Sequence, residues 1–261
     1  MTRLIAAHPD FRPDAHQQAF IRALNAECRP WQDIIPTAEL MVLPLFVWDY
    51  SQRPATFCAW LDRCERASTR LVNPAPLLRW NLEKGYLATL PGATPIQRLH
   101  SRADWEALTG NPVIKPLIGQ SGRGVCRHSD GPPDFSAGQI YLAQPFIPAQ
   151  FEACLLYLNG QFSHAVQRRL APNEWRANSA YGATVSPLAP RPEWLALAER
   201  ALAALPGRPC YARVDMLIDG DDRAHINELE LIEPALYGQF APDFPARFRT
   251  ALRDYLAGEN P

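Results

Sequence analysis

The sequence predicts a mixed fold, in which an α/β layer is followed by a larger α+β region. Short apolar runs alternate with helical patterns up to about Pro91–Gly92, which is typical of an α/β layer. From Ala93 onward, two pairs of apolar runs flank turn sequences, which indicates antiparallel hairpins. We therefore divide the chain into residues 1–92 and 93–261. A length of 261 residues allows one large domain or two small ones at about 150 residues per domain.

Two strands and two helices are predicted in residues 1–92. The apolar runs 4–7 and 40–47 indicate strands, and the second is apolar enough to be buried on both faces, although Pro44 interrupts it. Asp14 can cap the start of one helix, and Pro54 suits the start of another. Each helix has an apolar stripe on one face, made of Phe20, Ile21 and Leu24 in the first and Phe57, Trp60, Leu61 and Cys64 in the second.

The rest of the chain contains six predicted strands and two amphipathic helices. Residues 113–116 and 140–143 are short strand candidates. Asn159–Gly160 is a strong hairpin signal, and a turn rich in Asp and Gly at 219–222 indicates a second hairpin. The strands of the two hairpins are residues 155–158, 161–166, 211–218 and 224–232. The helices are residues 193–205 and 243–256.

Composition excludes several classes of protein. Hydrophobic residues make up 47% of the chain, which argues against disorder, and a net charge of −1 disfavours nucleic-acid binding by bulk charge. The apolar run 41–48 is far shorter than the ~20 residues of a membrane-spanning helix, and no signal peptide is recognisable. No cysteine pair has CxxC spacing, so we expect six reduced thiols in a cytoplasmic protein with no nucleic-acid or membrane partner.

Acidic side chains are concentrated on the strands of the second hairpin. Because side chains alternate along a strand, Arg213 and Asp215 share one face, and Glu228 and Glu230 share one face of the next strand. The turn near Gly220 brings these faces side by side. Three converging carboxylates would raise one another's pKa values, and a magnesium ion with oxygen ligands would relieve the repulsion. A solvated strand face with scattered acids is the alternative interpretation.

Three further groups carry positive charge or suit an anion. The loop 119–124 is rich in glycine but lacks the spacing of a P-loop or Rossmann motif, so a plain loop and a phosphate cradle both remain open. The only lysines, Lys84 and Lys115, are each compatible with a solvated or snorkelling side chain or with an anionic ligand. The arginines at 168, 169 and 176 are compatible with surface charges or with a clamp on a phosphoryl group.

In this order, these segments resemble the ATP-grasp superfamily. The elements that carry the resemblance are residues 81–87, 113–116, 119–125, 144–147, Glu152, 176–178, 213–215 and 228–234. Each is weak alone, but the ordered set is specific, and the resemblance covers about residues 47–237. Among subfamilies, the chain is most similar to enzymes like O-ureido-serine cyclo-ligase, which forms D-cycloserine, and more distantly to glutathione synthetase. The resemblance implies an ATP-grasp fold with a short N-terminal α/β (pre-ATP-grasp) domain.

The resemblance also implies which residues bind ATP. Both lysines would contact the phosphates, the glycine-rich loop would close over them, the hinge 144–147 would read the adenine, and Glu152 would bind the ribose. The residues assigned to ATP are Lys84, Lys115, Gln120, Ser121, Gly122, Gly124, Gln144, Phe146, Ile147 and Glu152.

Magnesium and catalytic roles are likewise implied by the resemblance. Asp215, Glu228 and Glu230 would hold two Mg²⁺ ions, with Glu230 where glutathione synthetase has asparagine. Arg176 would stabilise the transferring phosphate, assisted by Arg213. Because the protein contributes little covalent chemistry in such reactions, the work lies in positioning and charge neutralisation.

The implied activity is that of an ADP-forming carboxylate–amine ligase. A small carboxylate is activated as an acylphosphate, and an amine then displaces phosphate to form an amide. An ATP-grasp kinase, an intramolecular cyclo-ligase and a non-catalytic nucleotide-binding protein are the alternatives. The substrates would be small molecules, and a homodimer is compatible because ligases of this class are often dimers. Residues 44–47 depart from the Arg-Ser-Thr-like run of the cyclo-ligase-like relatives, so the substrates themselves are not assigned.

Overall fold

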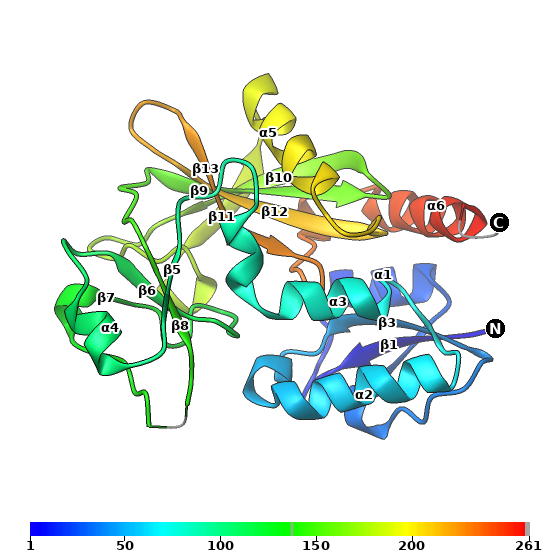
Figure 1. The fold of residues 1–261 in the computed structure, drawn as a ribbon. Helices are drawn as coiled ribbons and strands as arrows, with labels where there is room; N and C mark the ends of the chain where they lie inside the picture. The colour runs from blue at the N-terminus through cyan, green and yellow to red at the C-terminus, as the bar shows by residue number, and fades with distance from the viewer. Residues whose placement is uncertain (137, 259–261) are drawn as a thin grey trace.

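The structure is a computed structural model that describes residues 1–136 and 138–258. Its strands form three sheets, and helices flank each of them (Figure 1). The N-terminal sheet is parallel, whereas the other two are antiparallel. The predicted order of an α/β layer followed by an α+β region is therefore confirmed.

The N-terminal sheet has the strand order β2-β1-β3-β4. Its strands are β1 (Thr2–Ala7), β2 (Glu27–Pro30), β3 (Leu40–Phe46) and β4 (Arg70–Leu71). The helices of this layer are α1 (Ala15–Ala23), α2 (Pro54–Arg66) and α3 (Ala75–Leu82). Short 3-10 helices lie at η1 (Trp31–Asp33), η2 (Tyr50–Gln52) and η3 (Lys84–Ala88).

Both faces of the N-terminal sheet are covered by helices. Leu4 and Ala6 of β1 pack with α2 and α3, and Ile5 and Ala7 pack on the opposite side with α1 and the C-terminal helix α6 (Phe244–Ala257). Burial on both faces explains why these strands are nearly continuous apolar runs. The last helix of the chain therefore belongs to the core of the first layer.

The central sheet has five strands in the order β11-β10-β9-β12-β13. They are β9 (Phe151–Leu158), β10 (Gln161–Arg169), β11 (Thr184–Leu188), β12 (Tyr211–Ile218) and β13 (Ala224–Glu230). Both predicted hairpins are confirmed, and Asn159 and Gly160 have the positive φ angles, 50° and 78°, that a tight hairpin turn requires. Helix α5 (Pro192–Ala203) packs on one face through an apolar core. The opposite face carries charged side chains.

The third sheet is small and has the strand order β5-β8-β6-β7. Its strands are β5 (Gln97–Leu99), β6 (Val113–Pro116), β7 (Cys126–Arg127) and β8 (Tyr141–Gln144). It is accompanied by α4 (Arg102–Glu106) and η4 (His128–Asp130); η5 (Ser179–Tyr181) and η6 (Gly238–Phe240) lie in later loops. The glycine-rich loop joins β6 to β7, so this sheet carries it toward the central sheet.

Two buried asparagines join the N-terminal layer to the central sheet. The amide of Asn73, fully buried, donates to the carbonyls of Tyr211 and Leu231 at 2.9 and 2.8 Å. Asn81 donates to the carbonyl of Leu229 and accepts from the amide of Leu231, both at 2.9 Å. These bonds fix the orientation of the two layers around β13 and its continuation.

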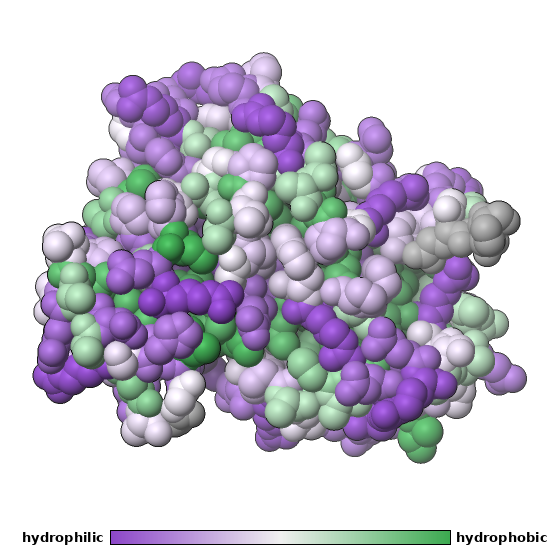
Figure 2. Space-filling view, in the orientation of Figure 1, coloured by the Kyte–Doolittle hydropathy of each residue, from purple (hydrophilic) through white to green (hydrophobic). Residues whose placement is uncertain are grey.

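The surface agrees with the amphipathic character of the outer elements. The β12–β13 turn and the outer side of α5, at the top of the view, are largely hydrophilic (Figure 2). Among the described residues, no helix combines the length and apolar character needed to cross a membrane.

Candidate active site

Two adjoining cavities lie where the three sheets meet. The first is between the small sheet and the charged face of the central sheet, and both lysines, the glycine-rich loop and the hinge 144–147 line it. The second, with a volume of about 840 Å³, lies between the N-terminal layer and the central sheet. The residues that line both cavities are Gln120, Ser121, Arg123, Arg168, Asn178, Glu228 and Glu230. The cavities thus meet at the glycine-rich loop and the acidic strand β13.

Lys84 is buried and Lys115 is half-buried in the wall of the first cavity. Lys84, 7% exposed, donates to the carbonyl of Gly119 at 2.8 Å and forms an ion pair with Glu228. Lys115 donates to Oδ1 of Asn227 at 2.6 Å. Burial lowers the pKa of Lys115 to about 8, against an ordinary value of 10.5. The sequence left open that each lysine is a solvated surface charge, and neither lysine is one in the structure.

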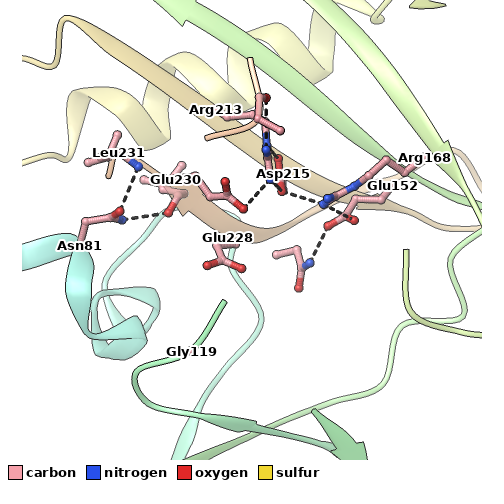
Figure 3. Close-up of polar contacts among 12 residues, drawn as sticks. Asn81, Gly119, Glu152, Arg168, Arg213, Asp215, Glu228, Glu230 and Leu231 are labelled. Atoms are coloured by element: carbon pink, nitrogen blue, oxygen red, sulfur yellow. Dashed lines mark hydrogen bonds and ion pairs between the residues drawn. The ribbon is translucent and has the colours of Figure 1, made fainter. Parts of the chain in front are cut away.

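An ion-pair network occupies the charged face of the central sheet (Figure 3). In the register of the β12–β13 hairpin, Asp215 lies opposite Glu228 and Arg213 lies opposite Glu230. Arg213 binds both carboxylate oxygens of Asp215, at 2.7 and 2.8 Å, and also pairs with Glu230. Arg168 bridges Asp215 and Glu152 at 2.8 and 2.6 Å. The predicted convergence of acids on one face is present, with two arginines among them.

The three predicted metal ligands stand in different environments. Glu228 and Glu230 line both cavities, whereas Asp215 is 1% exposed and lines neither. Burial would raise the pKa of Asp215, but Arg213 and Arg168 hold it below its ordinary value. Burial raises the pKa of Glu230 to about 7. Within residues 1–136 and 138–258, no three His, Cys, Asp or Glu side chains are grouped so that they could hold a metal ion. The ligand set therefore remains a prediction.

Glu152 and the hinge lie along the first cavity. Glu152 on β9 is 3% exposed, and its two oxygens accept from Arg168 and, at 2.6 Å, from Asn227. Gln144, at the end of β8, donates to the Thr94 hydroxyl at 3.0 Å. Phe146 and Ile147 line the cavity, and Arg127 stacks on the Phe146 ring at 3.7 Å. Glu152 is thus held within the ion-pair network, and its predicted contact with ribose is not tested by these contacts.

Arg176 and Tyr181 join a long loop to the glycine-rich loop. Arg176 lines the first cavity, pairs with Glu174 at 2.8 Å and stacks on the Tyr181 ring at 3.6 Å. The Tyr181 hydroxyl donates to the carbonyl of Gly122 at 3.1 Å. Gly122 has φ +71°, and a Cβ there would lie 2.6 Å from Oδ1 of Asn178. Only glycine permits this close approach.

Sequence reasoning missed Asn227, which contacts both Lys115 and Glu152. Strict alternation along β13 would place it on the face opposite Glu228. The register shifts between Asp215 and Met216, however, so that one extra residue of β13 is accommodated there. Such a bulge turns the Asn227 side chain toward the charged face. An asparagine directly before two acids was the one available signal.

Comparisons with known proteins agree with this geometry. The family model of the N-terminal domain of D-cycloserine synthetase DcsG matches residues 4–73. The cycloserine biosynthesis protein DcsG of Streptomyces lavendulae is 27% identical over 80% of this chain and 81% of its own length. A glutathione synthetase of Pseudomonas aeruginosa is 25% identical over 76% of this chain and 67% of its own. The chain thus has curated relatives over most of its length.

Solved structures show the same fold. The crystal structure of D-cycloserine synthetase DcsG has a TM-score of 0.82 at 24% identity and covers 98% of this chain and 100% of its own. D-alanine–D-alanine ligase from Bacillus anthracis has a TM-score of 0.65 at 12% identity, with coverages of 98% and 96%. The fold is therefore that of the ATP-grasp ligases, as predicted, and the expected enzyme class is that of the curated relatives. In particular, the chain is similar in sequence and fold to D-cycloserine synthetase DcsG.

Proposed function

We propose that this ATP-grasp ligase activates a small carboxylate with ATP and Mg²⁺ and joins it to an amine, with release of ADP. The observation that carries the proposal is the meeting of two cavities at the glycine-rich loop and at Glu228 and Glu230. One cavity suits the nucleotide, and the other suits the compounds to be joined. Holding reactants side by side is the main source of rate in such reactions.

The first cavity fits a nucleotide in chemistry. Lys84, Lys115 and the backbone N–H groups of the glycine-rich loop are donors suited to phosphates, and the apolar Phe146 and Ile147 suit a base. Solved relatives carry ATP in one case and Mg with ADP in another. The free volume is about 110 Å³, below the ~300–1,000 Å³ typical of ligand pockets, so we infer that the cavity widens when ATP binds.

The acidic strand fits a magnesium ion. Mg²⁺ is commonly held by one or two carboxylates together with substrate phosphates. Glu228 and Glu230 are partly exposed to the cavities and would supply those carboxylates, with Asp215 directly behind them. Bound ATP and Mg²⁺ would supply the phosphoryl group that activates the carboxylate. Arg176 would neutralise negative charge on the loop side, and Arg213 would do so on the side of the second cavity.

Arg123 suits the carboxylate that is to be activated. It lines both cavities and forms no ion pair with any other described residue. A guanidinium group binds carboxylate and phosphate oxygens with two parallel hydrogen bonds. At the junction, Arg123 would hold the carboxylate against the site of the terminal phosphate.

Release of ADP tests the proposal directly. A panel of amino acids, other small carboxylates and amines is screened with ATP and Mg²⁺. We expect ADP only when a carboxylate is present, and a condensation product by mass spectrometry when an amine is added. ADP release that needs no carboxylate, or a stable phosphorylated product, would contradict the ligase.

Intramolecular ring closure is the second candidate. The similarity to D-cycloserine synthetase DcsG over nearly the whole chain favours it. The same mass spectra separate the two reactions. Ring closure gives a product with the mass of one substrate minus water, whereas condensation gives the summed mass of two substrates minus water.

A homodimer remains a prediction, and light scattering on a sizing column tests it.

A further inference from the structure

The wall that the N-terminal layer gives to the second cavity is aromatic. Phe46 and Trp48 lie in edge contact, with ring centroids 6.2 Å apart, and Phe11 stacks behind Phe46 at 4.2 Å. Trp48 is 42% exposed, which is unusual for so large an apolar side chain. The lining residues from this layer include no lysine or arginine. The part of the wall made by Phe46 and Trp48 therefore suits an apolar body, and His16 is the one basic side chain that the described residues of this layer add to the lining.

Most charged groups around the second cavity are already paired within the protein. Arg168 and Arg213 are committed to the ion-pair network. Glu230 pairs with Arg213, and Glu228 pairs with Lys84. Asp14 accepts from the amide of Gln17 as the cap of α1 and sits exposed at the rim. Apart from Arg123, at the junction with the first cavity, these groups leave little net charge to attract a ligand.

Glu233 differs from these acids. It lies just after β13, is half-buried and lines the second cavity. No other described residue forms an ion pair or side-chain hydrogen bond with its carboxyl group. Burial raises its pKa well above the ordinary value, and the nearby Glu230 adds to this. A cationic ligand would relieve the cost of that buried charge.

Tyr50 is the polar neighbour of Glu233. It is 8% exposed, lines the same cavity, and its hydroxyl forms no hydrogen bond with the other described residues. Burial raises the pKa of Tyr50, and Glu233 is the neighbouring acid that raises it most. The Tyr50 hydroxyl is therefore free to bind a ligand in this cavity.

We propose that Glu233 and the Tyr50 hydroxyl bind the amino group of the amine acceptor, whose apolar or aromatic body packs on Phe46 and Trp48. This inference rests on the proposed function, because the amine is the acceptor of that ligation. An ammonium group donates charge-assisted hydrogen bonds to the carboxylate and the hydroxyl. The acceptor is thus an amine whose apolar part contacts the N-terminal layer and carries no carboxylate at that contact.

Calorimetric titration of the ATP-free protein tests the inference without turnover. The probes are phenethylamine, phenethyl alcohol and phenylpropionate, which share an aromatic body and differ in the polar group. We expect the amine to bind about tenfold more tightly than the alcohol. Glu233→Gln should remove that preference, and Tyr50→Phe should reduce it about threefold. Glu199→Gln, an equal change of charge on the exposed face of α5, should leave it unchanged.

Three results would overturn the inference. These are equal binding of the alcohol or the acid, retention of the preference in Glu233→Gln, and no binding of any probe. Circular dichroism confirms that each variant is folded. The proposed function is measured separately through ATP binding and ADP release. Normal ADP release without an amine preference refutes this inference alone, whereas an amine preference without ADP release for any carboxylate refutes the ligase.

Discussion

Asp215 and Glu228 face each other across the β12–β13 hairpin, yet their carboxylates have different partners. Two arginines bind Asp215 in the buried core of the sheet, whereas Lys84 binds Glu228 at the edge of both cavities. Asp215 therefore stabilises the charged face of the sheet, whereas Glu228 contributes its carboxylate to the cavities. The two substitutions below separate these contributions.

Glu228→Gln should reduce ADP release by about 100-fold or more, because it removes a charge at the site proposed for magnesium. Glu228 is a quarter exposed, but its partner Lys84 is only 9% exposed, so unfolding by urea should show a loss of about 1–3 kcal/mol. Glu106→Gln, which alters an exposed pair with Arg102, is the control. An unchanged rate would remove Glu228 from the metal site.

Asp215→Asn should destabilise the fold strongly. The change leaves Arg213 and Arg168 buried without their shared carboxylate, and breaking a buried pair costs about 3–5 kcal/mol. Urea unfolding followed by circular dichroism measures the loss. Asp221→Asn, in an exposed pair with Arg223, should change stability by less than about 1 kcal/mol. Equal stability of the two variants would contradict a structural role for the network.

ATP affinity should fall as the pH rises above about 8. Lys115 titrates at about 8 in the free protein, and contact with phosphates would raise that pKa, so binding takes up a proton above this pH. Below pH 8 Lys115 is already charged, so it adds no further pH dependence there. Lys115→Arg stays charged throughout and should bind ATP without this decline. Calorimetric titration at several pH values measures the ATP affinity of both proteins. If the affinity of the arginine variant also falls above pH 8, a group other than Lys115 causes the decline.

Gly122→Ala should weaken ATP binding about tenfold with little change in the melting temperature. The new methyl group would meet Asn178 and Tyr181 and push the glycine-rich loop from the loop that carries Arg176. Gly110 has a similar φ of +72° but open space around it, so Gly110→Ala imposes the backbone strain without a steric clash. Comparing the two variants therefore separates these effects. Similar affinities for the two variants would show that contact between the loops does not shape the nucleotide site.

The hairpins and the main helices were predictable because local chemistry dictates them. Asn159–Gly160 supplies positive φ angles, and the capping box of Asp14 and Gln17 begins α1 as expected. The short strands β2, β4, β5, β7 and β11 were not predicted, because each depends on a neighbouring strand more than on its own pattern.

The site was predictable in its members but not in its contacts. The order of segments brought the lysines, the glycine-rich loop and the acids to one place. The arginines that bind Asp215, and the bulge that turns Asn227, depend on register and burial. Glu233 and Tyr50 were missed because their significance comes from a cavity formed between segments far apart in the chain.

The packing of α6 against α1 has a consequence for protein engineering. The last helix of the polypeptide fills one side of the first layer, so the core of that layer is made from both ends of the chain. A chimera that exchanged residues 1–92 alone with those of a homologue would pair a foreign sheet with the resident helix. Transferring the aromatic wall of Phe46 and Trp48 into another protein should therefore succeed only when both terminal segments are transferred together.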